Sequence, residues 1–499
     1  MKKGLSTPLV LLSGLFTAQV GFMLLVYVSN HELLTALKEI HGTEAAYFTI
    51  PAGNVVTRLG QLFTAFNGGL FFTFTLGAGL SVTAFSFGWV WYHLLGRNKN
   101  ILCLAIICWV GCVAMLNYNG PQFIISGTFL LIPLVVFSLT VVPRPPDCER
   151  FSKACLSLHI LLLFLSVLGM GYFGGNVSFS NFRDTFLLSN PAGIMINDFY
   201  YRYTLHAARV FKPLDKRTVN TCSIDVGGDD ALGNRLEKIL VNADFFPVTP
   251  GINVDLIITK DGKQLCCSHR GKRILQCDTG DFSKNPSAWL KQFSLKTDAH
   301  FQFRQMIYLA LVAGLPLFVY LFLCALLQIF LGKMGWSENR IEMAVPGLVL
   351  FIAMVMSGIL SYESRISPRV SQSPVQYLAS PHVRERIAAL KVICRKKINI
   401  VDFQTYGALL ESSHVGERYW ATRALAYSRG KGVEKRLLSL IEDSHPNVVC
   451  QALYALGKRR DKRDLQEIIH RITTSDHWYI QWYGYRAVKQ LGWKQIALN

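Results

Sequence analysis

Two histidines and one glycine-rich run have the residue types and spacing that could bind a metal or a cofactor. His93 lies near the end of one apolar segment and His159 near the start of another. Histidines on facing helices can ligate haem or a metal ion, but both positions are also close enough to polar loops to be hydrated. The run 169–174 (GMGYFG) fits the dinucleotide fingerprint by its letters, yet it ends an apolar segment instead of joining a strand to a helix. We expect no cofactor, with haem or a metal at His93 and His159 as the alternative.

Four cysteines in the polar region 174–304 could form disulfide bonds. They are Cys222, Cys266, Cys267 and Cys277. An even number of cysteines outside the cytoplasm is typical of disulfide pairing. If Gly271 and Lys272 form a hairpin turn, Cys266 falls opposite Cys277, and Cys222 and Cys267 make the other pair. All three pairings stay open, and four free thiols in a cytoplasmic domain are the alternative.

The acidic and aromatic residues of the same region form no catalytic pattern. Asp225, Asp229 and Asp230 flank a glycine pair but supply too few oxygen ligands for calcium. Asp229 and Asp230 instead favour the start of the helix that follows, through its dipole. The aromatic run from Asp198 to Thr204 could line an interfacial pocket of a lipid or sugar transferase. The sequence therefore favours a protein without enzymatic activity, with the transferase as an alternative.

Most of the chain around these residues consists of apolar blocks of the length that crosses a membrane. The chain has 499 residues, of which 51% are hydrophobic and 17% charged, whereas a soluble protein carries about a quarter charged residues. A helix of about 20 apolar residues spans the hydrocarbon core of a bilayer. We expect a polytopic α-helical membrane protein with seven spans, at about 8–28, 69–95, 101–117, 121–142, 155–173, 305–331 and 342–361.

The basic loops predict how the chain is oriented. Lys2 and Lys3 and the loops 96–100 and 143–154 carry the basic residues that favour the cytoplasmic side. Seven spans then place the region 174–304 and the C-terminus outside a bacterial inner membrane, in the periplasm. One miscounted span would reverse the side of the C-terminus.

We expect five regions along the chain. They are a five-span membrane region (1–173), an extracytoplasmic α+β domain behind an interfacial segment (174–304), a two-span membrane region (305–361), a polar linker (362–375) and a repeat domain (376–499). The α+β assignment rests on a helical pattern over 229–242 and on β-rich runs with turns at 261–262 and 270–272, which are good hairpin signals.

A spacing of small residues recurs in the last quarter of the chain. Ala421, Ala424 and Leu425 place small residues at i and i+3 and an aliphatic residue at i+4, and the same pattern returns 31 and then 32 residues later. A period of this size is typical of stacked helical hairpins. Residues 448–457, with Val448, Ala452, Ala455, Leu456 and Gly457, resemble the core of HEAT repeats, particularly the short type of phycobilisome lyases, and 380–390 resemble a fainter copy. The resemblance implies an α-solenoid with a binding role.

The tail also carries most of the positive charge. Residues 362–499 hold 23 Lys and Arg against 12 Asp and Glu, which gives +11 of the net +19. This charge indicates an anionic partner such as lipid headgroups or an acidic protein surface, although it could simply keep the repeats soluble; we do not expect nucleic acid. Arg and Trp are enriched among interface anchors, so the candidates for partner binding are Arg384, Arg386, Arg418, Arg423, Trp478 and Trp482. Capping of the terminal repeat is an alternative role for the tryptophans.

These patterns favour an inner-membrane scaffold or assembly subunit that docks a protein partner through its repeats in an envelope complex. A subunit of a lipid or envelope-polymer transporter or flippase is the first alternative, and a membrane-embedded lipid or sugar transferase the second. We expect contacts with membrane lipid and with one or more protein partners.

Overall fold

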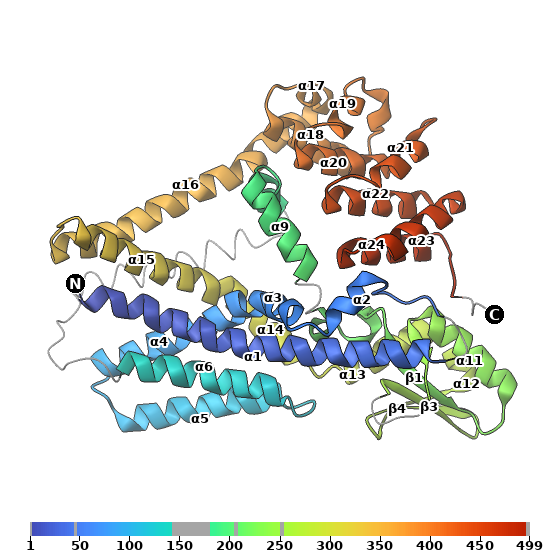
Figure 1. The fold of residues 1–499 in the computed structure, drawn as a ribbon, viewed down its shortest axis with the longest axis horizontal. Coiled ribbons are helices and arrows are strands. Elements are labelled where there is room, and N and C mark those ends of the chain that lie inside the picture. The colour runs from blue at the N-terminus through green and yellow to red at the C-terminus, as the bar shows by residue number, and fades with distance from the viewer. Residues whose placement is uncertain (1, 44–46, 142–179, 204–207, 250–253, 496–499) are drawn as a thin grey trace. The chain divides into compact units, whose positions relative to one another are not determined.

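The computed structural model describes residues 2–43, 47–141, 180–203, 208–249 and 254–495. The chain divides into two compact units (Figure 1). The first unit comprises residues 1–28, 65–180 and 299–360, and the second comprises 29–64, 181–298 and 361–499. Each unit is thus built from three separate stretches of the chain.

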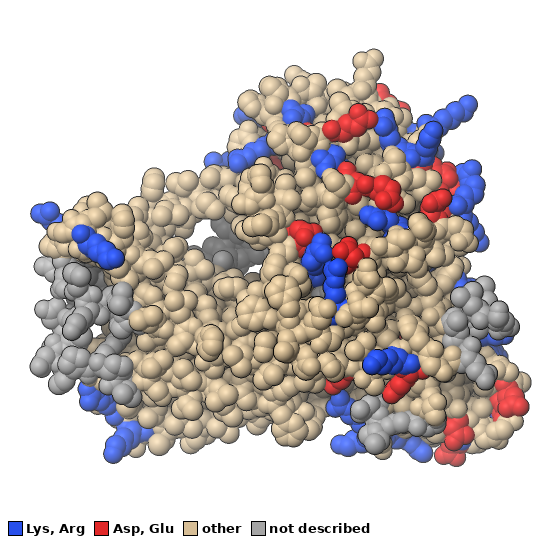
Figure 2. Space-filling view, viewed as in Figure 1, with Lys and Arg blue, Asp and Glu red and all other residues tan. Residues whose placement is uncertain are grey.

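Long apolar helices form the first unit, and three of them (α1, α3 and α16) extend into the second. Their bounds are α1 Lys2–His41, α3 Leu62–Phe72, η1 Thr73–Gly77, α4 Ala78–His93, α5 Lys99–Leu116, α6 Phe123–Val141, α14 Phe301–Leu309, η4 Ala310–Gly314, α15 Leu315–Lys333 and α16 Glu338–Gln372. Within the described part of the chain, six stretches are long and apolar enough to cross a membrane: Thr7–His41, Leu62–His93, Lys99–Leu116, Phe123–Val141, Phe301–Lys333 and Ala344–Gln372. On the face that Figure 2 shows, charged side chains are rare along the middle of these helices. The seventh predicted span, 155–173, lies outside the described residues.

Small residues let the helices of the first unit approach closely. A Cβ added to Gly77 would lie 2.5 Å from the Ala18 methyl, and one added to Gly314 would lie 2.5 Å from the Gly79 Cα. Such contacts between small residues are a usual way of packing helices in a membrane. Gly77, Gly79 and Gly314 therefore serve helix packing.

A five-stranded mixed sheet with helices forms the inserted part of the second unit. The strands are β1 Asn220–Asp225, β2 Phe245–Pro247, β3 Leu256–Asp261, β4 Gln264–His269 and β5 Lys272–Asp278, in the order β2-β1-β3-β4-β5. β1 runs parallel to β2 and β3, and the other pairs are antiparallel. The remaining elements are η2 Arg183–Leu187, α9 Pro191–Tyr203, α10 Ala208–Phe211, η3 Leu214–Lys216, α11 Asp230–Asn242, α12 Thr279–Lys284 and α13 Pro286–Lys296.

This insert agrees with the α+β domain that the sequence predicts. Both turns fall where expected, because β3 ends at Asp261 and β5 begins at Lys272. The Asp229 carboxylate accepts a hydrogen bond from the Leu232 N–H and caps α11, which is the helix-starting role inferred from its position. Leu236 and Leu240 of α11 and Phe293 of α13 pack in the core of the sheet.

The C-terminal region folds as successive helical hairpins. The helices are α17 Pro374–Leu378, α18 Val383–Lys396, η5 Ile400–Asp402, α19 Tyr406–Leu410, α20 Val415–Leu425, α21 Val433–Leu440, α22 Pro446–Arg459, η6 Lys462–Asp464, α23 Leu465–Thr474 and α24 Trp478–Gln490. The recurring small residues lie at close helix contacts: a Cβ on Gly457 would lie 2.9 Å from the Ala487 Cα, and one on Gly484 would lie 2.5 Å from Ile472.

The segment expected as a polar linker is mostly helical. Residues 362–372 continue α16, and α17 begins at Pro374. The polar composition of this stretch is therefore compatible with a continuous helix that leads into the repeats. The second unit also contains α2, Asn54–Leu59, which follows the cis peptide bond between Ile50 and Pro51.

Candidate protein-docking surface of the repeats

A histidine precedes the second helix of every hairpin. His382, His414, His445 and His477 are the N-cap residues of α18, α20, α22 and α24. Two residues before each one, the side chain of a serine or aspartate accepts a hydrogen bond from the histidine N–H, at 2.8 to 3.1 Å. The sequence signal for this feature is a Ser/Asp-x-His triplet at the repeat period, which our sequence analysis missed.

Two of the arginines predicted to bind a partner join successive repeats. The Arg386 guanidinium donates to Glu417 at 2.7 Å, and that of Arg418 donates to Asp443 at 2.9 Å. Glu417 is almost fully buried, since 2% of it is exposed. Both arginines therefore hold one hairpin against the next, and their guanidinium groups are already engaged.

The other four candidates differ in their exposure. Arg384 is exposed on α18, whereas Trp478 is buried at the start of α24. Arg423 and Trp482 are half-buried on one face of the array, where the Arg423 Cζ lies 5.3 Å from the centre of the Trp420 ring. The role of these residues in partner binding stays a prediction, and the position of Trp478 fits a packing role.

One face of the second helices carries alternating aromatic and basic side chains. Trp420 and Arg423 come from α20, Tyr454 from α22, and Trp482 and Arg486 from α24. The Arg486 Cζ lies 4.6 Å from the centre of the Trp482 ring, and the Arg423 Cζ lies 5.5 Å from that of Tyr454. Aromatic and arginine side chains together favour binding, because they offer rigid apolar area with charged groups above it. We refer to these five residues and Lys212 as the aromatic–basic face.

The helix α9 packs beside this face. The Tyr201 ring stacks on Tyr479 with 4.3 Å between the ring centres, and the Asn197 side-chain amide donates to the Asn447 Oδ1 at 3.0 Å. On the opposite side, α9 exposes Met195, Ile196, Phe199 and Tyr200. The segment that the sequence predicts to lie at the membrane interface is thus also part of the repeat surface.

Buried ion pairs attach two further segments to the first repeat. These segments are η2, which precedes α9, and the C-terminal part of α16. The Lys391 Nζ lies 2.7 Å from the Asp184 carboxylate and 2.6 Å from that of Glu363. Arg183 pairs with the same Asp184 at 2.7 Å and donates to the Tyr419 hydroxyl at 3.0 Å. Two cations and two carboxylates balance here, which buried charges require.

The inserted domain contacts the last repeat. The Lys489 Nζ lies 2.7 Å from the Asp244 Oδ1, and the Tyr485 hydroxyl donates to the same oxygen at 2.5 Å. The Gln481 side chain exchanges two hydrogen bonds with the backbone of Ala52, each 3.0 Å long. The end of the solenoid is therefore covered by other parts of the chain, in addition to its own aromatic residues.

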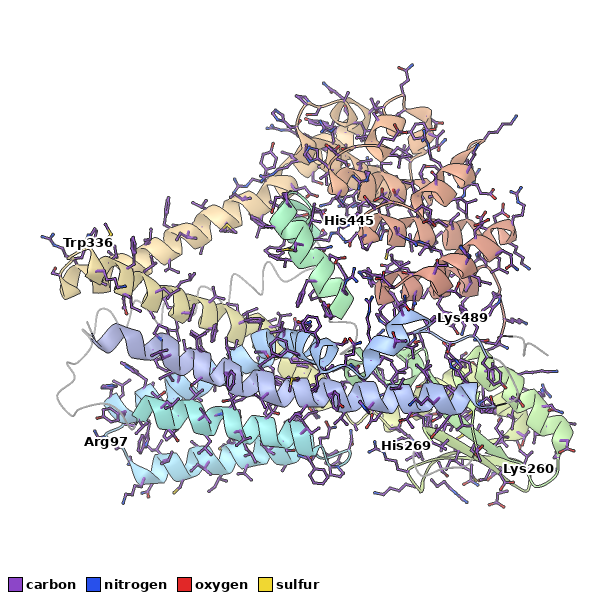
Figure 3. All side chains as sticks on the ribbon, in the orientation of Figure 1. Arg97, Lys260, His269, Trp336, His445 and Lys489 are labelled. Carbon is purple, nitrogen blue, oxygen red and sulfur yellow. The ribbon has the colours of Figure 1, made fainter. Side chains whose placement is uncertain are left out.

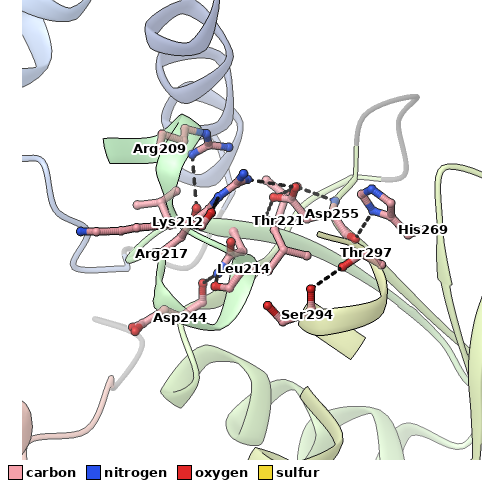
Figure 4. A network of polar contacts seen from close by, with 12 residues as sticks. Arg209, Lys212, Leu214, Arg217, Thr221, Asp244, Asp255, His269, Ser294 and Thr297 are labelled. Carbon is pink, nitrogen blue, oxygen red and sulfur yellow. Dashed lines mark hydrogen bonds and ion pairs between the residues drawn. The ribbon is translucent and has the colours of Figure 1, made fainter. Parts of the chain in front are cut away.

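A polar network stiffens the insert next to this contact (Figure 4). The Asp255 carboxylate accepts hydrogen bonds from the N–H and hydroxyl of Thr221, and the Asp255 carbonyl oxygen is 2.8 Å from the His269 Nδ1. Arg217 lies 4.0 Å from the same carboxylate. Burial lowers the pKa of Arg217 to about 10, with the nearby charge of Arg209 acting in the same direction.

The sheet of the insert corrects the strand register expected for Cys266 and Cys277. Cys277 lies opposite Leu265, and Cys266 lies opposite Gln276. β3 separates the strands of Cys222 and Cys267, which lie opposite Leu256 and Ile258 of β3, so these two cysteines are more than about 9 Å apart, farther than a disulfide reaches. Neither pair fits this register without backbone movement, and disulfide formation remains a prediction.

The remaining candidates for chemistry lie apart from the repeat face. His93 ends α4 beside the rings of Trp89 and Tyr92, while His159 lies outside the described residues. Asp198 pairs with Arg202 at 3.4 Å and with His477 at 3.5 Å. A pocket of about 220 Å³ lies at the end of the Asp198–Thr204 run, of which Thr204 itself is not described. Its lining includes Arg58, Phe63, Arg202, Tyr203, Asp476 and Trp478. The described residues contain no group of three or more His, Cys, Asp or Glu that could hold a metal ion.

Comparison with known families identifies the C-terminal region. Residues 406–488 match the family model described as HEAT repeats. No curated protein matches the chain. The C-terminal region is therefore an array of HEAT repeats, as the pattern at residues 448–457 predicted, and arrays of this class typically bind proteins along a continuous surface.

Proposed function

We propose that the protein is a bacterial inner-membrane scaffold that docks a protein partner through its HEAT repeats, as part of an envelope complex. The observation that carries the proposal is the aromatic–basic face, because tryptophan and arginine are among the side chains most often found at interface anchors. Its tryptophans and Arg423 are half-buried, and Arg486 is exposed. The six apolar helices would hold this surface at the membrane.

The contacts within the second unit support a periplasmic position for the repeats. Residues 29–64, 181–298 and 361–499 pack together, for example through the Tyr47 hydroxyl, which donates to Glu237 at 2.7 Å. Segments in contact must lie on one side of the membrane, so the chain crosses it an even number of times between residues 64 and 181. Three described spans fall in this interval, and the sequence-predicted span 155–173 would be the fourth. With a cytoplasmic N-terminus, the whole second unit is then periplasmic.

Site-specific crosslinking in cells tests the docking role. A photoreactive amino acid would replace Tyr427, which is half-buried next to Tyr454, or the exposed Lys435 on α21 as a control. We expect a protein adduct from position 427 that mass spectrometry identifies, and none from position 435. If position 427, next to Tyr454 of the aromatic–basic face, gives no adduct while the protein is folded and abundant, the docking role is wrong.

A cavity in the first unit favours a second candidate function, that of a subunit of a lipid transporter or flippase. It has a volume of about 660 Å³ and is lined mainly by apolar side chains of α4, α14, η4 and α15, including Leu80, Met306 and Leu317, together with Tyr320. An apolar cavity between membrane helices suits an acyl chain. An Ala313→Leu substitution would add side-chain volume at a residue that lines the cavity; loss of lipid movement with retained crosslinks at position 427 would support transport.

A further inference from the structure

Two basic side chains flank one indole ring at the last repeat. The Arg486 Cζ lies 4.6 Å and the Lys212 Nζ 5.1 Å from the centre of the Trp482 ring. Lys212 comes from the segment between α10 and η3, so two distant parts of the chain build this cluster. Cations at such distances are attracted to the face of the ring, which holds both of them in place.

A second cluster, made of one arginine and aromatic rings, lies on α20 and α22, the second helices of the two preceding hairpins. Arg423 of α20 lies over the rings of Trp420 and Tyr454, at 5.3 and 5.5 Å. The hydroxyls of Tyr427 and Tyr454 are 3.3 Å apart, so aromatic side chains connect α20 with α22. The two clusters therefore belong to one face.

Neither cluster contains a carboxylate that neutralises it. Among the described residues, Lys212, Arg423 and Arg486 have no Asp or Glu within ion-pair distance. The carboxylate next to this face belongs to Asp184, which accepts from the Trp420 indole at 2.8 Å, but Lys391 and Arg183 already share it. Burial and the charge of Arg486 lower the pKa of Lys212 to about 8. Lys212 and Arg423 are half-buried and Arg486 is exposed, and because none of the three has a counter-charge, an anion bound there would gain free energy.

We propose that the aromatic–basic face binds an extended acidic segment of a protein partner, with one carboxylate between Lys212 and Arg486 and a second at Arg423. Neighbouring helices pack about 8–10 Å apart, so the clusters on α20/α22 and α24 are roughly 15–20 Å apart. An extended chain covers this with about five residues, at ~3.3 Å per residue. A single lipid headgroup would reach one cluster, whereas a peptide reaches both and can place apolar side chains on Tyr454 and Trp482. The proposal rests on the docking role and names the chemistry of the partner.

Peptide binding to the purified full-length protein tests this assignment. The probe is a labelled peptide with two glutamates about five residues apart in a neutral background, and its fluorescence anisotropy reports binding. The comparison peptides carry glutamines in place of the glutamates, or place the glutamates side by side. We expect the spaced glutamate peptide to bind at least about tenfold more tightly than the glutamine peptide, and its affinity to fall as salt is added.

Matched substitutions locate the site. A double change of Lys212→Gln and Arg486→Gln, and separately Arg423→Gln, should each weaken binding of the glutamate peptide by about tenfold or more. The control removes the same charge elsewhere on the repeats, by Lys431→Gln with Lys435→Gln on and beside α21, both exposed. Thermal unfolding of every variant verifies that it is folded.

Three results would overturn the proposal. The peptides could bind equally, the control pair could weaken binding as much as the Lys212 and Arg486 pair, or vesicles of phosphatidylglycerol could require these residues while the glutamate peptide does not bind. The last result would assign the face to anionic lipid. If crosslinking at position 427 captures a partner while the glutamate peptide fails, the docking role stands and only the acidic chemistry of the partner is wrong.

Discussion

Lys489 in the last repeat forms an ion pair with Asp244 in the inserted domain, with 2.7 Å between Nζ and Oδ1. Lys489 is labelled in Figure 3, where it points away from α24 toward the insert. The two residues are 245 positions apart in the chain, and two predicted spans separate them. Their contact joins the insert to the repeats. It therefore bears on which side of the membrane the two lie and on the free energy of unfolding of the second unit.

The first prediction concerns the side of the membrane. A compartment-specific reporter inserted at the exposed 261–262 turn and another fused after Asn499 should report the same compartment, because the insert and the repeats are in contact. We expect both to be periplasmic. Opposite signals from the two positions would contradict the packing of the second unit, and two cytoplasmic signals would reverse the orientation predicted from the basic loops.

The second prediction concerns the Asp244 contact. Asp244→Asn keeps the left-handed backbone at φ 65°, which asparagine tolerates, but removes the charge that Lys489 and Tyr485 bind. We expect the free energy of unfolding of the second unit to fall by about 1–3 kcal/mol, measured by denaturant titration. The control is Asp261→Asn, since this side chain is largely exposed and its loss should cost under about 0.5 kcal/mol. Equal effects of both changes would show that the contact contributes no specific stability.

The third prediction concerns the buried ion pairs. Lys391→Met leaves Asp184 and Glu363 without their shared cation, and 9% of the Lys391 side chain is exposed. Removal of one partner from a buried pair costs about 3–5 kcal/mol, so we expect a loss of this size in the free energy of unfolding. Lys435→Met on the exposed side of α21 should leave the stability nearly unchanged. A small loss at position 391 would mean that water reaches the cluster.

The fourth prediction concerns the stability of the repeats at acidic pH. His445, labelled in Figure 3, is buried at the start of α22, and burial lowers its pKa to about 4, with smaller effects from the charges of Asp443, Arg418, Asp198 and His477. Between about pH 6.5 and 4 the unfolded chain therefore binds a proton here that the folded chain does not, and stability falls as the pH falls. The shift corresponds to about 3 kcal/mol at the acid end.

The test replaces the histidine by another N-cap residue. His445→Asn retains a side-chain acceptor for the Asn447 N–H but cannot titrate, so unfolding free energy should depend less on pH between 6.5 and 4. His382→Asn, at the same position of the first repeat but exposed, should leave the pH dependence as it is. If both variants behave like the unaltered protein, another group controls the acid sensitivity.

The fifth prediction concerns the affinity for the glutamate peptide at alkaline pH. Because the pKa of Lys212 is lowered to about 8 by burial and by Arg486, the side chain loses its charge as the pH rises above this value. Affinity for the glutamate peptide should therefore fall between about pH 7.5 and 9. In the Lys212→Gln variant the affinity should be lower at the outset and nearly constant over this range. A pH dependence that persists in that variant would assign it to a different group.

The sequence alone determined the features that depend on local order along the chain. Runs of about 20 apolar residues identify membrane helices because the bilayer sets their length, and six of the seven predicted spans coincide with long apolar helices. The spacing of Ala421, Ala452 and Gly484 identified the repeats, because close helix packing requires small residues at fixed intervals. The hairpin turns and the cap of α11 also follow from short-range chemistry.

Only the tertiary structure decided which distant residues meet. No local pattern brings Lys212 next to Arg486, or Asp184 next to Lys391, because these pairs depend on how the insert packs on the repeats. The same packing engages Arg386 and Arg418 between hairpins, whereas composition alone offered them as free binding residues. The candidate site was thus visible in the sequence as a list of residue types, and the fold determined which of those residues still have charge available for a partner.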